Sequence, residues 1–247
     1  MLLSLSTWPE VEDYLKTSKG IIVPVGSTEQ HGPMGFIGTD AICPEKIAHD
    51  FARQSGVLVA PTLPLGMSQH HLGFSGSITL RPSTFMAVVK DVIQSLAVHG
   101  FTHFLFFNGH GGNVGPLNAA FSEIYADYSL RGKSCPLHCK VMNWYEGDRV
   151  KAIIDRNFGE NEGSHATPGE LSLSFHAHAR TASTAPLDPE IPPNGDFRDA
   201  ADFRKNYPDG RMGSNSAMAD PAMGQALCRA GVEDIEECFR AFTPATG

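Results

Sequence analysis

The sequence predicts one α/β domain, spanning residues 1–247, whose parallel sheet is covered by helices on both faces. Strand-like apolar runs alternate with helix-like runs along most of the chain, an order typical of parallel strands joined by helical crossovers. No internal repeat and no linker divides the chain, and 247 residues can bury a sizeable core.

The strands are predicted from short, continuously apolar runs, which suit strands buried on both faces. Glycine-rich segments follow the first and third runs and indicate where those strands end. The predicted strands cover residues 21–25, 57–63, 103–107 and 139–145.

The helices are predicted from caps and from apolar residues at helical spacing. Thr7 and Glu10 form a capping-box pattern that opens a helix to about residue 16, and Pro44 suits the first turn of a helix that Gly56 ends. Further helices are expected over residues 85–96, 117–128, 168–179 and 221–242. We expect residues 64–83 to form a long loop and residues 181–216, rich in Pro, Asp, Asn and Gly, to form a surface excursion.

Composition excludes several function classes. A net charge of −8 leaves no basic footprint for nucleic acid or anionic membranes, and no stretch approaches the ~20 apolar residues of a membrane span. Residues 1–20 carry Pro9, Glu10, Glu12 and Asp13, which does not fit a signal peptide. The five cysteines are few and scattered, as expected for reduced thiols in a cytoplasmic protein.

The segment after the first predicted strand, residues 25–40, concentrates metal-binding residue types. Glu29 and His31 stand two positions apart, so an extended backbone directs both side chains the same way, and Asp40 follows a glycine-rich return. Ligands of parallel sheets bind beyond the carboxyl ends of the strands. Two carboxylates and an imidazole there suit a divalent transition metal. The alternative is a polar loop in which Asp40 caps the next helix.

Two later segments add candidates. The third predicted strand ends in FLFFNGHGGN, where three glycines surround His110 and leave its imidazole free to point into a site at the same edge, although a tight turn with a surface histidine also fits. In GSHATPGELSLSF, residues 163–175, Thr167 and Glu170 form a second capping box. This pattern by itself favours a helix cap at Glu170 and a surface-loop histidine at His165.

Four ordered motifs resemble the creatininase (creatinine amidohydrolase) family: GSTEQHGPMGFIGTD, SQHHLGFSGSITL, NGHGGN and HATPGELSLS. The resemblance covers roughly residues 20–180. It implies a three-layer α/β/α domain that assembles as a homo-hexamer, with two divalent metal ions per chain (zinc, manganese or iron in different branches of the family).

The resemblance also implies roles for individual residues. The expected metal ligands are Glu29, His31, Asp40 and His110, with Asp40 as the bridge and Glu170 completing the set, and His165 matches the histidine used in proton transfer. Ser77, Gly111 and Trp144 are expected to contact the substrate, although core packing is an alternative role for Trp144.

These assignments predict a hydrolase that cleaves a non-peptide or cyclic amide or formamide bond in a small-molecule substrate. Two metal ions about 3.5–4 Å apart would need a bridging carboxylate and could hold a hydroxide, which would attack the carbonyl. Creatinine itself is not the expected substrate, because Gly112 stands where creatininase has an acidic ligand and the lid tryptophan is absent from residues 158–164. The alternatives are a metal-dependent lyase or isomerase acting on a polar metabolite, or a non-catalytic metal-binding homologue.

Overall fold

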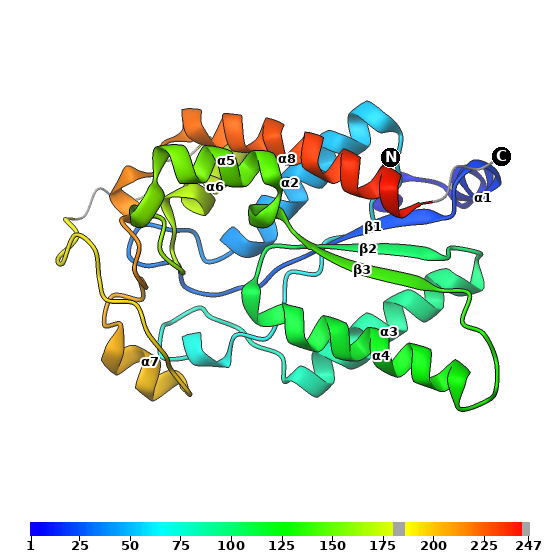
Figure 1. Ribbon diagram of the computed structural model, residues 1–247, viewed down its shortest axis with the longest axis horizontal. Helices are drawn as coiled ribbons and strands as arrows, with labels where there is room; N and C mark the ends of the chain where they lie inside the picture. The colour runs from blue at the N-terminus through cyan, green and yellow to red at the C-terminus, as the bar shows by residue number, and fades with distance from the viewer. Residues whose placement is uncertain (180–185, 244–247) are drawn as a thin grey trace.

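The computed structural model describes residues 1–179 and 186–243, and at its centre lies a three-stranded parallel sheet. The strands are β1 (Gly20–Val25), β2 (His103–Asn108) and β3 (His138–Asn143), hydrogen-bonded in the order β1-β2-β3. Gly20 pairs with His103, and His103 with His138, so the three strands start level. Their carboxyl ends therefore reach one common edge, on the left of Figure 1.

The run predicted as a second strand, residues 57–63, is not a strand but lies parallel to β1. Isolated bridges join Val59 to Ile22 and Leu63 to Val25. The Ile22 N–H donates to the Leu58 carbonyl at 3.1 Å, and the Leu63 N–H donates to the Pro24 carbonyl at 2.9 Å. Pro24 has no N–H to donate back, which interrupts the ladder at that position.

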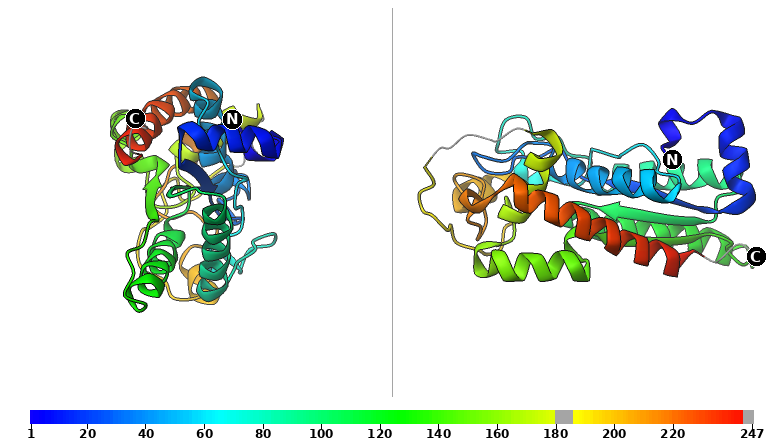
Figure 2. Two further views of the ribbon diagram at one scale, coloured as in Figure 1. Left: turned by 90° about the vertical axis from the view of Figure 1, so that its right-hand side faces the viewer. Right: turned by 90° about the horizontal axis from the view of Figure 1, so that it is seen from above.

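Two layers of helices sandwich the sheet, as expected for an α/β/α domain (Figures 1 and 2). On one face lie α2 (Thr39–Ser55), α5 (Asp148–Asn157), α6 (Pro168–His178) and α8 (Pro221–Phe242). On the other lie α3 (Pro82–Val98) and α4 (Val114–Ser129), while α1 (Trp8–Thr17) packs near the amino end of β1. Each layer has its own buried core, and the alternating faces of β1 and β2 supply both.

The capping box of α1 is confirmed, because the Thr7 N–H donates to the Glu10 carboxylate at 2.7 Å. Single-turn 3₁₀ helices connect the larger elements: η1 (Leu3–Leu5), η2 (Gln69–His71), η3 (Gly111–Asn113), η4 (Trp144–Glu146), η5 (Gly159–Asn161) and η6 (Ser216–Met218). Within the two described ranges, no helix has the length and apolar character needed to cross a membrane.

Helix α2 begins earlier than the sequence predicts. It starts at Thr39, so Pro44 lies inside the helix and Asp40 lies in its first turn instead of in the preceding loop. Pro44 has no N–H, so the Asp40 carbonyl receives no helical hydrogen bond from it. The backbones of Gly26 and Gly109 approach that carbonyl closely: a Cβ at either position would lie 2.2 or 2.0 Å from its oxygen. The two glycines thus let β1 and β2 pack directly against the turn that carries Asp40.

The segment predicted as a surface excursion, residues 181–216, is largely part of the packed structure. Residues 181–185 lie outside the described residues; the rest contains α7 (Ala200–Asn206), whose Phe203 is buried. The Arg211 guanidinium is also buried and donates to the carbonyls of Pro189, Glu190 and Ser214. We call residues 189–216 the strap, because this folded segment lies against the loops at the carboxyl edge of the sheet.

Candidate metal centre

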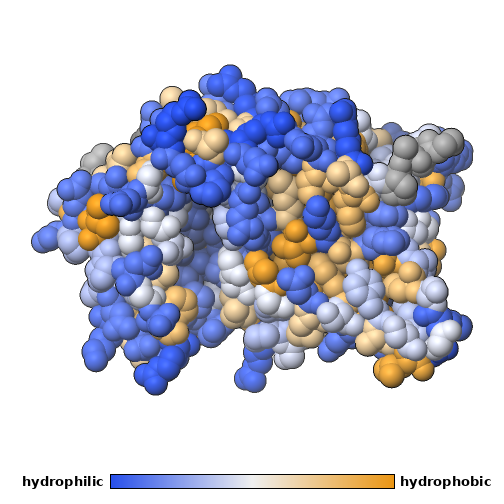
Figure 3. Space-filling view, in the orientation of Figure 1, coloured by the Kyte–Doolittle hydropathy of each residue, from blue (hydrophilic) through white to orange (hydrophobic). Residues whose placement is uncertain are grey.

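The candidate site lies in a cleft of about 850 Å³ at the carboxyl edge of the sheet. The segment after β1, the turn after β2 and the segment before α6 all reach this cleft, because parallel strands end at the same edge. Figure 3 shows the hollow on the left of the molecule. The cleft is lined by the predicted residues Asp40, His110, His165 and Glu170, and also by Trp144, Tyr145, Phe197, Phe203 and Met212.

The two carboxylate oxygens of Asp40 face two different sets of candidate ligands. Oδ1 lies 3.1 Å from His31 Nε2, and Oδ2 lies 3.2 Å from His110 Nδ1. The sets are Glu29, Asp40 and His110, and His31, Asp40 and Glu170; within each set the donor atoms lie within 4.8 Å of one another. Asp40 belongs to both, which is the geometry of a carboxylate that bridges two metal ions.

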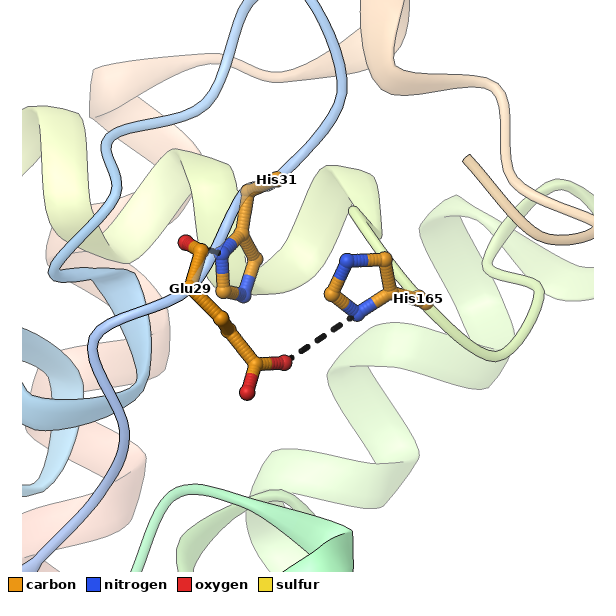
Figure 4. A group of neighbouring side chains, drawn as sticks. All are labelled: Glu29, His31 and His165. Atoms are coloured by element: carbon orange, nitrogen blue, oxygen red, sulfur yellow. Dashed lines mark hydrogen bonds and ion pairs between the residues drawn. The ribbon is translucent and has the colours of Figure 1, made fainter. Parts of the chain in front are cut away.

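Glu29 is fully buried with three imidazoles around one of its oxygens. Its Oε1 lies 3.0 Å from His71 Nε2, 3.3 Å from His110 Nδ1 and 3.8 Å from His165 Nδ1. Figure 4 shows Glu29, His31 and His165 converging, with the last contact drawn as a dashed line. Neither oxygen of Glu29 has a partner in hydrogen-bonding geometry among the described residues, and Asp40 Oδ2 has none either. Buried carboxylate oxygens without partners are costly, and cations would satisfy them.

Backbone carbonyls orient two of the candidate ligands. His31 Nδ1 lies 3.1 Å from the Glu29 carbonyl, and His110 Nε2 lies 3.0 Å from the Met67 carbonyl. A carbonyl only accepts, so each of these nitrogens carries a proton, and His31 Nε2 and His110 Nδ1 are directed at Asp40. Fixing one ring nitrogen so that the other is free for a metal is how histidine ligands are held.

The pKa values follow from burial among opposite charges. Burial lowers the pKa of His31, but Asp40 and Glu170 outweigh it and raise it to about 10. Burial likewise lowers the pKa of His110, and Glu29 and Asp40 raise it to about 9. Burial raises the pKa of Asp40, but His31 and His110 hold it well below its usual range. Without metal, the two imidazolium ions therefore carry the positive charge that balances the acids.

Glu170 is both a helix cap and a residue of the site. The Thr167 N–H donates to Glu170 Oε1 at 2.6 Å and the Glu170 N–H donates to Thr167 Oγ1 at 3.1 Å, which confirms the capping box. The other oxygen, Oε2, lies 3.7 Å from His31 Nε2. Burial raises the pKa of Glu170 to about 7.

His165 is held from both sides instead of lying in a surface loop. Its Nε2 lies 2.8 Å from the Gln30 carbonyl, and its own carbonyl accepts from Ser214 Oγ at 2.6 Å. The strap also pairs with it through a bridge to Met212. Burial, with the neighbouring His71 and His31, holds the pKa of His165 well below its usual range, so this ring is neutral.

The three residues expected to bind substrate have different surroundings. Gly111 and Trp144 line the cleft, and Trp144 comes from η4 instead of the predicted strand and is also packed in the core. Ser77 does not line it; its Oγ accepts from the Gln30 N–H at 3.1 Å and so supports the loop that carries Glu29 and His31.

Sequence reasoning missed Gln30, His70 and His71. All three are buried, and both histidines line the cleft. Gln30 stands between Glu29 and His31 in the first motif, and the histidine pair lies in the second. Their positions inside two of the four motifs could have indicated a role in the site. The spacing of residues in those motifs, however, gave no chemical reason to select these three.

The chain is similar in sequence and in fold to known proteins. The family described as "Creatininase: Creatinine amidohydrolase" matches residues 4–239. A 3-dehydro-scyllo-inosose hydrolase of Thermotoga maritima is 33% identical over 174 residues, which cover 68% of this chain but only 53% of the relative. A mycofactocin precursor peptide peptidase of Mycobacterium tuberculosis is 32% identical over 186 residues, 71% of this chain and 68% of the relative.

The fold is shared with solved creatininases. A structure described as manganese creatininase superposes with a TM-score of 0.82 at 22% identity, covering 98% of this chain and 99% of that one. The match to the family over residues 4–239, together with these relatives, establishes that the chain belongs to the creatininase family.

Proposed function

We propose that this protein is a dinuclear metal-dependent amidohydrolase that cleaves a non-peptide or cyclic amide or formamide bond. The observation that carries the proposal is the position of Asp40, whose two oxygens face His110 and His31 at 3.2 and 3.1 Å. One carboxylate shared between two sets of ligands suits two ions a short distance apart.

The donor set fits hard or borderline divalent ions. Three carboxylates and two imidazoles suit zinc, manganese or iron. Both carboxylate oxygens of Glu29 and Oδ2 of Asp40 have no hydrogen-bond partner among the described residues, so they are free to bind cations. When bound, two such ions would polarise the amide carbonyl and lower the pKa of a water molecule. We assign Glu29, His31, Asp40, His110 and Glu170 to hold them.

The remaining residues of the cleft suit binding and proton transfer. His165 presents Nδ1 toward Glu29 and is neutral, so it can take up a proton and deliver it to the leaving nitrogen. Gly111 has no side chain to obstruct the centre, and Trp144 provides a flat apolar wall. A small amide bound between them would place its carbonyl at the metals and its nitrogen toward His165.

The test is metal analysis combined with an activity screen. The protein reconstituted with zinc, manganese or iron is assayed on cyclic amides, formamides and short peptides, in water enriched in ¹⁸O. We expect about two metals per chain and one ¹⁸O atom in the carboxylate product. A product without ¹⁸O would indicate a lyase or isomerase, and metal binding without turnover of any substrate would indicate a non-catalytic homologue.

We further propose that the chain forms a homo-hexamer in the cytoplasm. Large apolar side chains lie exposed on η1, α1, α3 and beside α4, with Leu5 81%, Trp8 74%, Val98 83% and Leu130 86% exposed, and each would be buried where it meets another copy. All five cysteines are free, as a reducing compartment requires. Size-exclusion chromatography with light scattering measures the number of chains in the oligomer. Fractionation of the source cells shows the compartment that holds the protein.

A further inference from the structure

Gln30 lies at the meeting point of three distant segments. Its side chain is buried, and its Nε2 lies 2.9 Å from His71 Nδ1, 2.9 Å from His165 Nε2 and 2.9 Å from the Gly210 carbonyl oxygen. These partners come from η2, from the segment before α6 and from the strap. A primary amide has two hydrogens to donate, so it cannot donate to all three.

Two backbone groups fix which way the amide points. The Gly32 N–H donates to Gln30 Oε1 at 2.8 Å, and the Gly210 carbonyl accepts from Nε2. Exchanging oxygen and nitrogen would set N–H against N–H at Gly32 and oxygen against oxygen at Gly210. The orientation therefore follows from groups whose donor and acceptor roles do not change.

The second amide hydrogen belongs to His71. His165 Nε2 also lies 2.8 Å from the Gln30 backbone carbonyl, which only accepts, so this nitrogen carries a proton and cannot accept from the amide. His71 Nδ1 is then the remaining acceptor. With Nδ1 accepting, the neutral His71 ring carries its proton on Nε2, the atom 3.0 Å from Glu29 Oε1.

We propose that Gln30 is a positioning residue that selects the tautomers of His71 and His165. It places the proton of His71 on Nε2, the ring nitrogen 3.0 Å from Glu29 Oε1, and it leaves His165 Nδ1 bare, 3.8 Å from the same oxygen. Its side chain acts on His71, and its backbone carbonyl acts on His165.

The consequence for chemistry rests on the proposed function. An N–H dipole beside Oε1 stabilises the negative charge of the Glu29 carboxylate, as the groups around metal ligands do. A bare His165 Nδ1 is ready to take a proton. The Gly210 carbonyl ties this arrangement to the strap, and a Cβ at Gly210 would lie 1.9 Å from Gln30 Oε1, so only glycine fits there without displacing the amide.

The direct test reads the tautomers without measuring activity. Zinc-loaded protein labelled with ¹⁵N-histidine is studied by magic-angle-spinning NMR, which separates bare from protonated ring nitrogens in an oligomer of any size. His71→Asn and His165→Asn identify the two rings by the signals that disappear. We expect a bare Nδ1 and a protonated Nε2 in both rings; a proton on Nδ1 of His71 overturns the proposal.

Substitution of Gln30 tests the cause. Gln30→Glu keeps the shape but has no amide hydrogen, so His71 is expected to gain a proton on Nδ1, and zinc affinity should fall about 10- to 100-fold. Gln30→Met, which adds no charge, should leave His71 in a mixture of tautomers. Gln94→Glu adds the same charge on the exposed face of α3 and should change neither readout.

An unchanged His71 spectrum in folded Gln30→Glu and Gln30→Met would show that Gln30 does not select the tautomer. If Gln30→Glu does not fold, the wild-type spectrum and the Gln30→Met spectrum still show whether Gln30 selects the tautomer of His71. If the wild-type protein binds none of zinc, manganese and iron, the proposed function fails, but the tautomers are still read in the metal-free protein. The two failures are thereby distinguished.

Discussion

Glu170 caps helix α6 through Thr167 with only one of its two carboxylate oxygens. The Thr167 N–H donates to Oε1 at 2.6 Å, while Oε2 is directed at His31. The capping and ligand interpretations of the sequence therefore do not exclude each other, and two variants separate them.

Glu170→Gln is expected to keep the helix and weaken the metal site. Gln serves in a capping box as Glu does, so the melting temperature of the metal-free protein should change little, whereas loss of the charge should lower metal content and turnover by orders of magnitude. Thr167→Ala is the matched variant: it should cost about 1 kcal/mol of stability and keep the metals. Full metal content and normal turnover in Glu170→Gln would show that Glu170 is only a cap.

Asp40→Asn is expected to lose both metals together, because the residue belongs to both sets of ligands. His31→Ala should lose mainly one metal, since His31 Nε2 faces Asp40 and Glu170 on one side of the site. Elemental analysis of the purified variants measures this, with Asp127→Asn, exposed on α4, as the control. Loss of a single metal in both variants would contradict the bridge.

Metal binding is expected to release protons. Burial lowers the pKa values of His31 and His110, but the neighbouring carboxylates outweigh burial and raise them to about 10 and about 9. Both rings are therefore charged at pH 7 without metal. A metal needs the neutral ring. Affinity should therefore rise with pH up to about 9–10, and binding heats should depend on the ionisation enthalpy of the buffer. His99→Gln, exposed beside α3, is the control; heats independent of the buffer would refute the prediction.

Creatinine is expected to be a poor substrate, and Gly112→Glu should not make it a good one. A Cβ at residue 112 would lie 2.4 Å from His110 Nε2 and 2.6 Å from the Met67 carbonyl, so any side chain disturbs the bond that orients His110. The variant should lose metal instead of gaining a ligand. Creatinine turnover of ~1–10³ per second, the common enzymatic range, in either protein would overturn this.

The sequence by itself determined three of the four predicted strands, the two capping boxes and most of the candidate ligands. Continuous apolar runs mark β1, β2 and β3, and the two capping boxes are local patterns that form as predicted. Because parallel strands end at one edge, Glu29, His31 and His110 were expected to meet from their positions after β1 and β2 alone. The ligand assignments themselves await the metal analysis.

Tertiary structure alone decided how these residues are held. Whether Asp40 could face both sets of ligands depended on the start of α2 and on the close approach of Gly26 and Gly109, which no helix-start pattern indicates. The strap looked like solvent-exposed sequence, since polar and proline-rich composition does not reveal that Arg211 will be buried under backbone carbonyls. Gln30 joins residues up to 180 positions apart. Such hydrogen bonds link segments without any local periodicity, so they exist only once the chain has folded.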